Sequence, residues 1–190
     1  MINLELIPAK LNINQRRYIG NKSKLMPWIA PLIKKYTTGK SFFDVFAGTG
    51  SVTEYMIHDY ETYYINDFLY SNYKAFSAFF SNTPIDTEKI DKYYRIFSNI
   101  NSRKYDDTYF EREYGEKFFS KNDAIKIGEI RERIERAKDL NNREKNILIT
   151  SLLYSADRVA NTVGHYDAYR KNVKIHDKFK FELINTTNTK

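Results

Sequence analysis

Two apolar runs with the features of β-strands lie on either side of a glycine turn. The first run, Phe-Phe-Asp-Val-Phe at positions 42–46, leads into Gly48-Thr49-Gly50, and the second covers 62–67 and is rich in Tyr and Ile. The segment between them, 51–60, is predicted to form a short helix that the turn opens. Strand, turn, helix and strand in this order predict a βαβ unit with parallel strands and a right-handed crossover.

Helical periodicity marks the chain on both sides of this unit. Before it, apolar residues at 25, 28, 29, 32 and 33 have helical spacing, and prolines at 27 and 31 require an early start or a kink. After residue 70 the pattern predicts helices over 71–81, 86–100, 120–140 and 142–161. Residues 1–15 are predicted to be extended or irregular, and those from 162 to 190 a loop and a polar tail.

The helix predicted over 120–140 carries the clearest local signals. Ser120, followed three residues later by Asp123, predicts a capping box at its start. Isoleucines at 125, 127, 130 and 134 supply one apolar face, and Arg and Glu supply the other. The whole pattern predicts an α/β fold in two parts, with residues 1–70 forming the α/β part and residues 71–190 a helical lobe with its tail.

The charge of the chain is unevenly distributed. The net charge is +7, no acidic residue occurs between positions 9 and 43, and a second basic cluster lies between positions 170 and 180. Two basic ends favour a polyanionic partner such as nucleic acid, although a solvated basic face explains the charge equally well.

Composition excludes several classes of protein. The chain has no cysteine, so disulfides and cysteine nucleophiles are excluded. No stretch has the length of a membrane span, and the first residues lack the apolar segment of a signal peptide. We therefore expect a cytoplasmic protein with no membrane partner.

The glycine turn is the first candidate for chemistry. Gly48-Thr49-Gly50 is neither the three-glycine dinucleotide fingerprint nor a P-loop. However, Asp67 ends the second predicted strand, where a carboxylate in a doubly wound sheet accepts bonds from ribose hydroxyls. A turn of this kind is also common between any strand and helix, so the glycines alone do not decide; together with Asp67 they favour a ligand that contains a nucleoside.

Four segments together carry a resemblance to a known family. They are RRYIGNKSKLMPWI, FFDVFAGTGSV, YYINDF and LLYSADRVANTVGHYDAY, in this order. They resemble the N-terminal part of the Dam-like, alpha-group adenine-N6 DNA methyltransferases of restriction-modification systems, and the resemblance runs from about Arg16 to Lys171. It implies a partial Rossmann-like, S-adenosylmethionine-dependent methyltransferase fold with a helical target-recognition lobe.

The resemblance assigns a cofactor site to the glycine turn and the ends of both strands. It places Asp44 near the methionine ammonium group of S-adenosylmethionine, Lys22 near the methionine carboxylate, and Asp67 on the ribose hydroxyls. Without the resemblance, Lys22 is a surface lysine and Tyr18 a core aromatic. The residues that it places around the cofactor are Tyr18, Lys22, Asp44, Phe46, Ala47, Gly48, Gly50 and Asp67.

The resemblance also assigns contacts with double-stranded DNA to the end of the last predicted helix and the segment that follows it. The candidate residues are Arg158, Asn161, His165, Tyr166, Arg170 and Lys171. Arg and Asn are able to make bidentate contacts with base edges. The alternatives are that Arg158 is a buried partner of Asp157 or Glu144, and that Asn161 is a helix cap. His165 and His176 lack the spacing of zinc ligands.

The catalytic motif of the family, Asp/Asn-Pro-Pro-Tyr/Phe, does not occur in the sequence. The prolines stand at positions 8, 27, 31 and 84 only. We therefore expect a truncated or split methyltransferase with no catalytic residue of its own, and a first strand whose open apolar edge pairs with a second polypeptide or a second copy. The alternatives are a nucleic-acid-binding module that does not catalyse, and an unrelated nucleotide-binding α/β protein.

Overall fold

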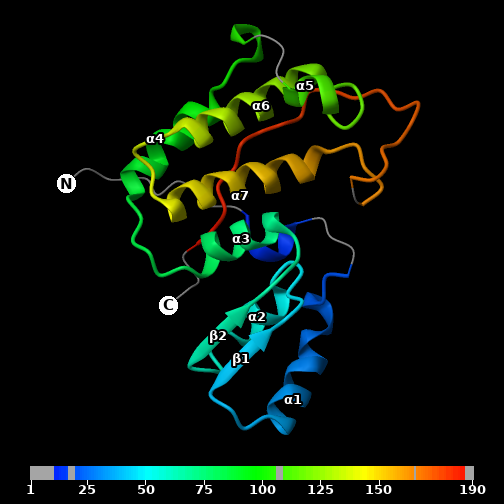
Figure 1. The fold of residues 1–190 in the computed structure, drawn as a ribbon. Helices are drawn as coiled ribbons and strands as arrows, with labels where there is room; N and C mark the ends of the chain where they lie inside the picture. The colour runs from blue at the N-terminus through cyan, green and yellow to red at the C-terminus, as the bar shows by residue number, and fades with distance from the viewer. Residues whose placement is uncertain (1–10, 17–19, 106–108, 165, 187–190) are drawn as a thin grey trace, which may run out of the picture.

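The computed structural model describes residues 11–16, 20–105, 109–164 and 166–186, and its elements follow the order drawn in Figure 1. The first part holds two 3-10 helices, η1 (Ile13–Gln15) and η2 (Ser23–Leu25), and then α1 (Met26–Tyr36), β1 (Ser41–Asp44), α2 (Ser51–Met56) and β2 (Thr62–Ile65). The second part holds α3 (Tyr70–Phe80), α4 (Thr87–Ser98), η3 (Ser102–Lys104), α5 (Tyr109–Tyr114), α6 (Lys121–Arg136) and α7 (Asn142–Val159).

The predicted βαβ unit is confirmed. The strands β1 and β2 form a parallel two-stranded sheet in which Phe42 pairs with Tyr63 and Asp44 with Ile65. The connecting helix α2 is shorter than the predicted 51–60. It ends at Met56 because the Met56 carbonyl accepts bonds from the Asp59 amide and the Tyr63 hydroxyl, which turn the chain back toward β2.

The two faces of this sheet have different surroundings. Phe42 on one face packs against the small core that α1 and α2 form around Met26, Ala30 and Met56. On the other face the rings of Phe43 and Tyr64 pack edge to face with centroids 6.1 Å apart, and both remain exposed. The sheet is therefore covered by helices on one face only within the described residues.

The helical lobe is built from α3, α4, α6 and α7, which confirm the four helices predicted after residue 70. In Figure 1, α6 and α7 lie side by side above α3, and the sheet lies below α3. The isoleucines predicted for the apolar face of α6 are all buried, and Ile127, Ile130 and Ile134 belong to the lobe core. The short helix α5 was not predicted, since it follows a polar stretch with no apolar period of its own.

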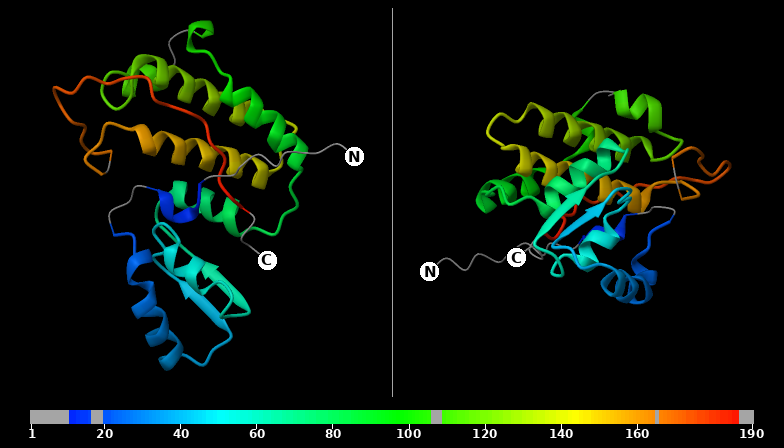
Figure 2. Two further views of the ribbon diagram at one scale, coloured as in Figure 1. Left: turned by 180° about the vertical axis from the view of Figure 1, so that it is seen from behind. Right: turned by 60° about the horizontal axis from the view of Figure 1, so that its bottom comes forward.

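The tail was predicted to be polar, but four of its side chains are apolar and buried. Residues 172–186 lie along α6 and α7, as the rear view in Figure 2 shows. Phe179, Phe181, Leu183 and Ile184 are buried in the lobe core. Lys178, Lys180 and Glu182 alternate with these apolar side chains and mask the pattern in the sequence, and both lysines stay exposed.

The N-terminal segment packs into the same core. The amide of Leu11 donates to the carbonyl of Leu183 at 3.2 Å, and both Leu11 and Ile13 are buried with the lobe residues. Leu11 and Ile13 therefore belong to the core of the lobe, although the sequence analysis assigned residues 1–70 to the α/β part. The domain boundary at residue 70 stays a prediction.

The side chain of Ser120 caps the start of α6. Its hydroxyl accepts a bond from the Asp123 amide, as predicted. The second half of the predicted capping box is wrong, because the buried Asp123 carboxylate accepts bonds from the amides of Lys178 (2.6 Å) and Phe179 (2.9 Å) instead. Asp123 thus fastens the tail to α6.

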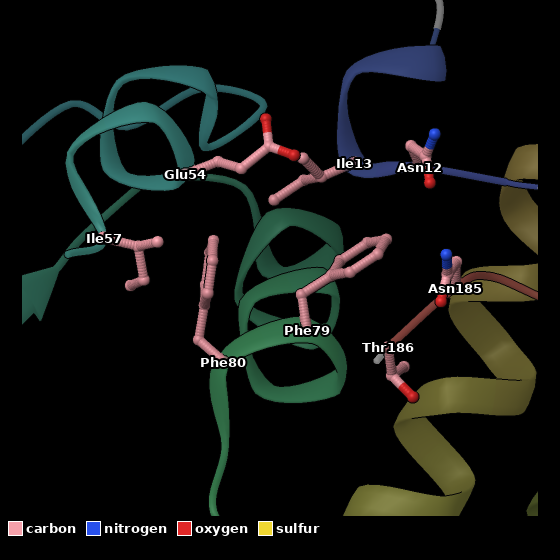
Figure 3. A pocket seen from close by; sticks show the side chains of 8 residues that line it. All are labelled: Asn12, Ile13, Glu54, Ile57, Phe79, Phe80, Asn185 and Thr186. Atoms are coloured by element: carbon pink, nitrogen blue, oxygen red, sulfur yellow. The ribbon is translucent and has the colours of Figure 1, made fainter. Parts of the chain in front are cut away.

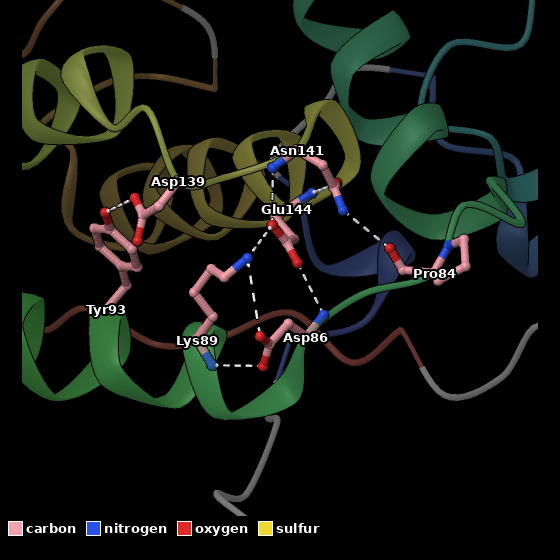
Figure 4. Close-up of polar contacts among 7 residues, drawn as sticks. All are labelled: Pro84, Asp86, Lys89, Tyr93, Asp139, Asn141 and Glu144. Atoms are coloured by element: carbon pink, nitrogen blue, oxygen red, sulfur yellow. Dashed lines mark hydrogen bonds and ion pairs between the residues drawn. The ribbon is translucent and has the colours of Figure 1, made fainter.

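A buried glutamate joins α4 to α7 (Figure 4). The carboxylate of Glu144 accepts bonds from the amides of Asp86 and Asn141, both at 2.8 Å, and lies 3.5 Å from the Lys89 ammonium group. Nearby, the Tyr93 hydroxyl donates to Asp139, and burial together with this carboxylate raises the pKa of Tyr93 to about 12. These contacts set the ends of α4 and α7 side by side.

In the described part of the chain, no helix is long and apolar enough to cross a membrane.

Candidate functional site

The predicted cofactor residues gather at the carboxyl ends of β1 and β2. In a parallel sheet of this kind, ligands bind at that edge. The loops that leave the two strands are tied together, because the Asn66 amide donates to the Asp44 carbonyl and the Ala47 amide to the Asn66 carbonyl, both at 2.9 Å. The edge is therefore a fixed surface rather than two separate loops.

Asp67 holds the glycine turn in place. One of its carboxylate oxygens accepts a bond from the Gly48 amide at 2.8 Å. The other accepts bonds from the Leu69 amide and from the Asn72 side chain, at 2.9 and 2.8 Å. Since a carboxylate offers about four acceptor positions, Asp67 retains capacity for one more donor, such as a ribose hydroxyl.

Gly48 and Gly50 both adopt positive φ angles, of 58° and 80°, which favour glycine. At Gly50 there is a second reason, because an added Cβ atom would lie 2.9 Å from Ile13 Cδ1 and 3.2 Å from Phe76. The absence of a side chain at Gly50 is thus explained by packing against η1 and α3. For the approach of a ligand to the bare backbone, Gly48 is the stronger candidate.

Asp44 ends β1 half-buried, with one carboxylate oxygen bonded to the Thr53 hydroxyl at 2.8 Å. The other oxygen is able to accept from an ammonium group. Phe46 is 87% exposed although it follows an apolar strand. An aromatic ring so exposed beside a fixed backbone turn is a surface that a ligand would cover.

Lys22 is exposed just before η2, and its segment lies beside the start of α2. The link is Asn21, whose side-chain oxygen accepts bonds from the Ser51 hydroxyl and the Ser23 amide, both at 2.9 Å. Tyr18 lies outside the described residues. The remaining predicted cofactor residues are all found at this edge of the sheet or next to it.

Phe68 belongs to the same surface and was missed in the sequence. It follows Asp67 directly and is 98% exposed. In the sequence, Phe68 could have been identified as an aromatic residue directly after Asp67, the residue predicted to bind the ribose. Together with Phe46, it gives this edge two exposed rings, and flat ligands such as an adenine ring stack on such surfaces.

Glu54 of α2 lies behind the site, at a small pocket of about 30 Å³ (Figure 3). Burial raises the pKa of the Glu54 carboxyl, and the bond from the Asn14 side chain opposes this rise. Ile13, Phe79 and Phe80 contribute the apolar part of the lining. This pocket lies at the junction of η1, α2 and α3, and it is too small for a cofactor.

A chain of polar contacts runs from the cofactor site into the helical lobe. The Asn72 side chain, which donates to Asp67, accepts a bond from the guanidinium group of Arg16. Arg16 in turn lies 3.5 Å from the buried Asp157 carboxylate, and its side chain is only 12% exposed. Asp157 also accepts a bond from the Tyr166 hydroxyl at 2.8 Å. One network thus links Asp67 with a predicted DNA contact.

The predicted DNA contacts lie on the end of α7 and on the loop that follows it. Arg158 forms an ion pair with Glu182 of the tail, and not with Asp157 or Glu144, the partners that the sequence suggested. Asn161 is not a helix cap. Its amide group donates to the carbonyls of Lys117 and Arg170, both at 3.0 Å, and so ties the loop to the segment before α6.

Three of the remaining predicted contacts, Tyr166, Arg170 and Lys171, are exposed residues of that loop. Tyr166 is partly covered by the ring of Phe118, with centroids 5.5 Å apart, while Arg170 and Lys171 are exposed. His165 lies outside the described residues. Arg170 and Lys171 are therefore better placed than Arg158 for a contact with a phosphate backbone, because the ion pair already occupies Arg158.

The fold is a small α/β unit joined to a helical lobe, and the predicted cofactor residues lie at the carboxyl edge of its sheet. The family model of the D12 class N6 adenine-specific DNA methyltransferases matches residues 18–189, and the chain belongs to this family. The alternative of an unrelated nucleotide-binding protein is therefore wrong.

Relatives with established names include modification methylases. The chain is 33% identical over 188 residues to the modification methylase LlaI of Lactococcus lactis subsp. lactis. The matched region covers 88% of this chain and 29% of the relative. It is 34% identical over 175 residues to the type II methyltransferase M.CviAII of Paramecium bursaria Chlorella virus 1, with 85% and 51% covered. The chain thus spans between about a quarter and about half the length of the curated relatives it matches. No solved structure matches it.

Proposed function

We propose that this chain provides the S-adenosylmethionine-binding part and the DNA-contacting lobe of an adenine-N6 DNA methyltransferase of a restriction-modification system, with the motif order of the alpha group. The observation that carries the proposal is the cofactor edge, where Asp44, the Gly48 turn and Asp67 stand together in a chain of the D12 family. S-adenosylmethionine supplies an electrophilic methyl group on a sulfonium centre.

The residues present fit this cofactor. The free oxygen of Asp44 suits the methionine ammonium group, the remaining acceptor position of Asp67 suits a ribose hydroxyl, and Lys22 suits the carboxylate. The exposed rings of Phe46 and Phe68 flank the edge on the two strand-end loops, where an adenine ring would cover them.

The helical lobe supplies the contacts with DNA in this proposal. Arg170 and Lys171 would bind phosphates, and Tyr166 would lie at the same surface from its position beside Phe118. The net charge of +7 favours the approach of a polyanion.

The experiment that tests the proposal is an equilibrium titration of duplex DNA at several salt concentrations, with and without S-adenosylmethionine. We expect binding that weakens steeply with salt and tightens when the cofactor is present. In a plot of the logarithm of the binding constant against the logarithm of the salt concentration, replacing Arg170 and Lys171 by alanine should make the slope less steep. The change should be about one for each phosphate that the variant no longer neutralises.

One alternative is a nucleic-acid-binding module that does not catalyse. The observation in its favour is the basic, exposed loop, which needs no cofactor to attract DNA. Salt-dependent DNA binding that the cofactor leaves unchanged would support this alternative and contradict the methyltransferase assignment.

A further inference from the structure

Arg16 joins the two helices that support the two proposed ligand sites. Its guanidinium group donates to the side chain of Asn72 and, at 3.2 Å, to the hydroxyl of Ser71, both on α3. Its Nε atom lies 3.5 Å from the carboxylate of Asp157 on α7, so these contacts form a bridge between the two helices. The Arg16 side chain is only 12% exposed and is poorly placed to contact a ligand itself. The proposed function therefore leaves this bridge without a role.

On the α3 side, the bridge reaches the cofactor edge through one amide group. Asn72 is 1% exposed, and its side chain accepts the bond from Arg16 and donates to Asp67 at 2.8 Å. An amide group used at both ends cannot turn without losing a bond. Since Asp67 also accepts the bond from the Gly48 amide, the position of Arg16 bears on the carboxylate that the proposed function assigns to the ribose.

On the α7 side, the bridge reaches the loop assigned to DNA through one hydroxyl group. Asp157 is 3% exposed and accepts a bond from the Tyr166 hydroxyl at 2.8 Å. The Tyr166 ring packs against Phe118 with centroids 5.5 Å apart, so both ends of this side chain are held. Arg170 and Lys171, the proposed phosphate contacts, lie in the same loop. A movement of the loop that displaces Tyr166 therefore acts on Asp157.

The central contact of the bridge is not fully closed. The Nε atom of Arg16 is buried and forms no hydrogen bond with any described residue. Its distance of 3.5 Å from Asp157 exceeds the roughly 2.7–2.9 Å of a charge-assisted hydrogen bond. A buried donor without an acceptor costs stability. A small approach of the Asp157 carboxylate would satisfy this donor and give the pair a second, closed arrangement.

We propose that Arg16 is a positioning residue that couples the cofactor edge to the DNA loop. A ligand at either site favours the closed pair of Arg16 and Asp157, because it fixes Asp67 at one end of the bridge or Tyr166 at the other. Each ligand then strengthens binding of the other by the same factor, since coupling between two binding sites is reciprocal. This inference rests on the proposed function and adds the route by which cofactor and DNA affect each other.

The test measures a coupling factor, the ratio of the dissociation constants of S-adenosylmethionine without and with DNA. The full chain is titrated calorimetrically with S-adenosylmethionine, first alone and then with a saturating pool of short duplexes of random sequence. Tyr166→Phe keeps the ring on Phe118 and removes the hydroxyl. Arg16→Lys keeps the charge and loses the planar fork that reaches both helices. Tyr169→Phe is the matched control, because the Tyr169 ring also packs on Phe118 but lies outside the bridge.

We expect a coupling factor of about 5 or more for the native chain, in the range that coupled sites commonly show. Tyr166→Phe and Arg16→Lys should each reduce it to below about 2, and Tyr169→Phe should leave it at the native value. A purely structural loss would weaken both titrations alike and leave their ratio unchanged. Thermal melting of each variant measures such a loss separately, and Tyr166→Phe is decisive if Arg16→Lys does not fold.

Three other results would overturn the inference. A coupling factor that stays at the native value in both Tyr166→Phe and Arg16→Lys would place the route elsewhere and leave the proposed function intact. Loss of coupling in Tyr169→Phe as well would assign it to the loop as a whole rather than to the bridge. A native coupling factor of one would contradict the inference and the proposed function together, because the proposed function expects the cofactor to tighten DNA binding.

Discussion

At the scale of single residues, Asp67 has two tasks that the structure separates. It fixes the Gly48 turn through one carboxylate oxygen and the start of α3 through the other. Its remaining acceptor capacity is what the proposed function assigns to the ribose. A substitution at Asp67 therefore acts on both the turn and the ligand.

Replacement of Asp67 by alanine should weaken S-adenosylmethionine binding at least about 10-fold, since hydrogen bonds to charged groups contribute roughly 1.5–3 kcal/mol. Asn66→Ala is the matched control, because the exposed Asn66 side chain donates only to the Val45 carbonyl. Calorimetric titration and thermal melting of both variants distinguish loss of the ligand from loss of the fold. A folded Asp67→Ala variant with the native dissociation constant would refute the site assignment.

Glu54 provides a test by pH. Burial raises the pKa of its carboxyl above the value in the unfolded chain, which is about 4.3. The folded state therefore binds the proton more readily. The stability that Glu54 contributes is fully present below the unfolded pKa and is lost as the pH rises through the folded pKa.

Glu54→Gln should accordingly raise the melting temperature at neutral pH, because the amide carries no charge and still offers an acceptor to Asn14. The difference from the native chain should vanish below about pH 4, where Glu54 is protonated in both states. Glu61→Gln, at an exposed pair with Lys40, is the control. Thermal melting of Glu54→Gln that is indistinguishable from the native chain at neutral pH would show that burial does not disturb this carboxyl.

At the scale of elements, the contact between the N-terminal segment and α7 is carried by a buried charge pair. Arg16 and Asp157 are 12% and 4% exposed and lie 3.5 Å apart. The side chain of Asn72 in α3 accepts a bond from Arg16, and the hydroxyl of Tyr166 in the loop donates to Asp157. The position of Asp67 thus depends on side chains from the N-terminal segment, α3, α7 and the loop after α7.

Asp157→Asn should destabilise the fold by about 3 kcal/mol, because Arg16 is left buried without a counter-charge. It should also weaken S-adenosylmethionine binding, since Arg16 holds Asn72 against Asp67. The control is Asp59→Asn, which breaks a more exposed pair with Lys34 and should cost below about 1 kcal/mol. Chemical denaturation provides the free energies of unfolding, and equal losses for the two variants would show that the buried pair has no special role.

At the scale of the whole molecule, local patterns predicted the elements and missed the long-range contacts. The apolar runs at 42–46 and 62–67, the cap at Ser120 and the helical spacing of apolar residues act within a few residues, and they predicted the βαβ unit and the long helices. The burial of Phe179 and Phe181 and the Arg16–Asp157 pair join segments far apart in sequence, which no local period records. The family resemblance assigned the cofactor residues, of which Asp67 is also marked by its place at the end of a predicted strand, whereas Arg158 was assigned to DNA without any sign of its partner Glu182.

The central claim is that the carboxyl edge of β1 and β2 is an S-adenosylmethionine site. The measurement that tests it most directly is calorimetric titration of the full chain with S-adenosylmethionine and, for comparison, with S-adenosylhomocysteine and NAD. We expect saturable binding of S-adenosylmethionine and S-adenosylhomocysteine at one site per chain, with little or no heat from NAD. Tighter binding of NAD, or no binding of S-adenosylmethionine by the folded chain, would contradict the account.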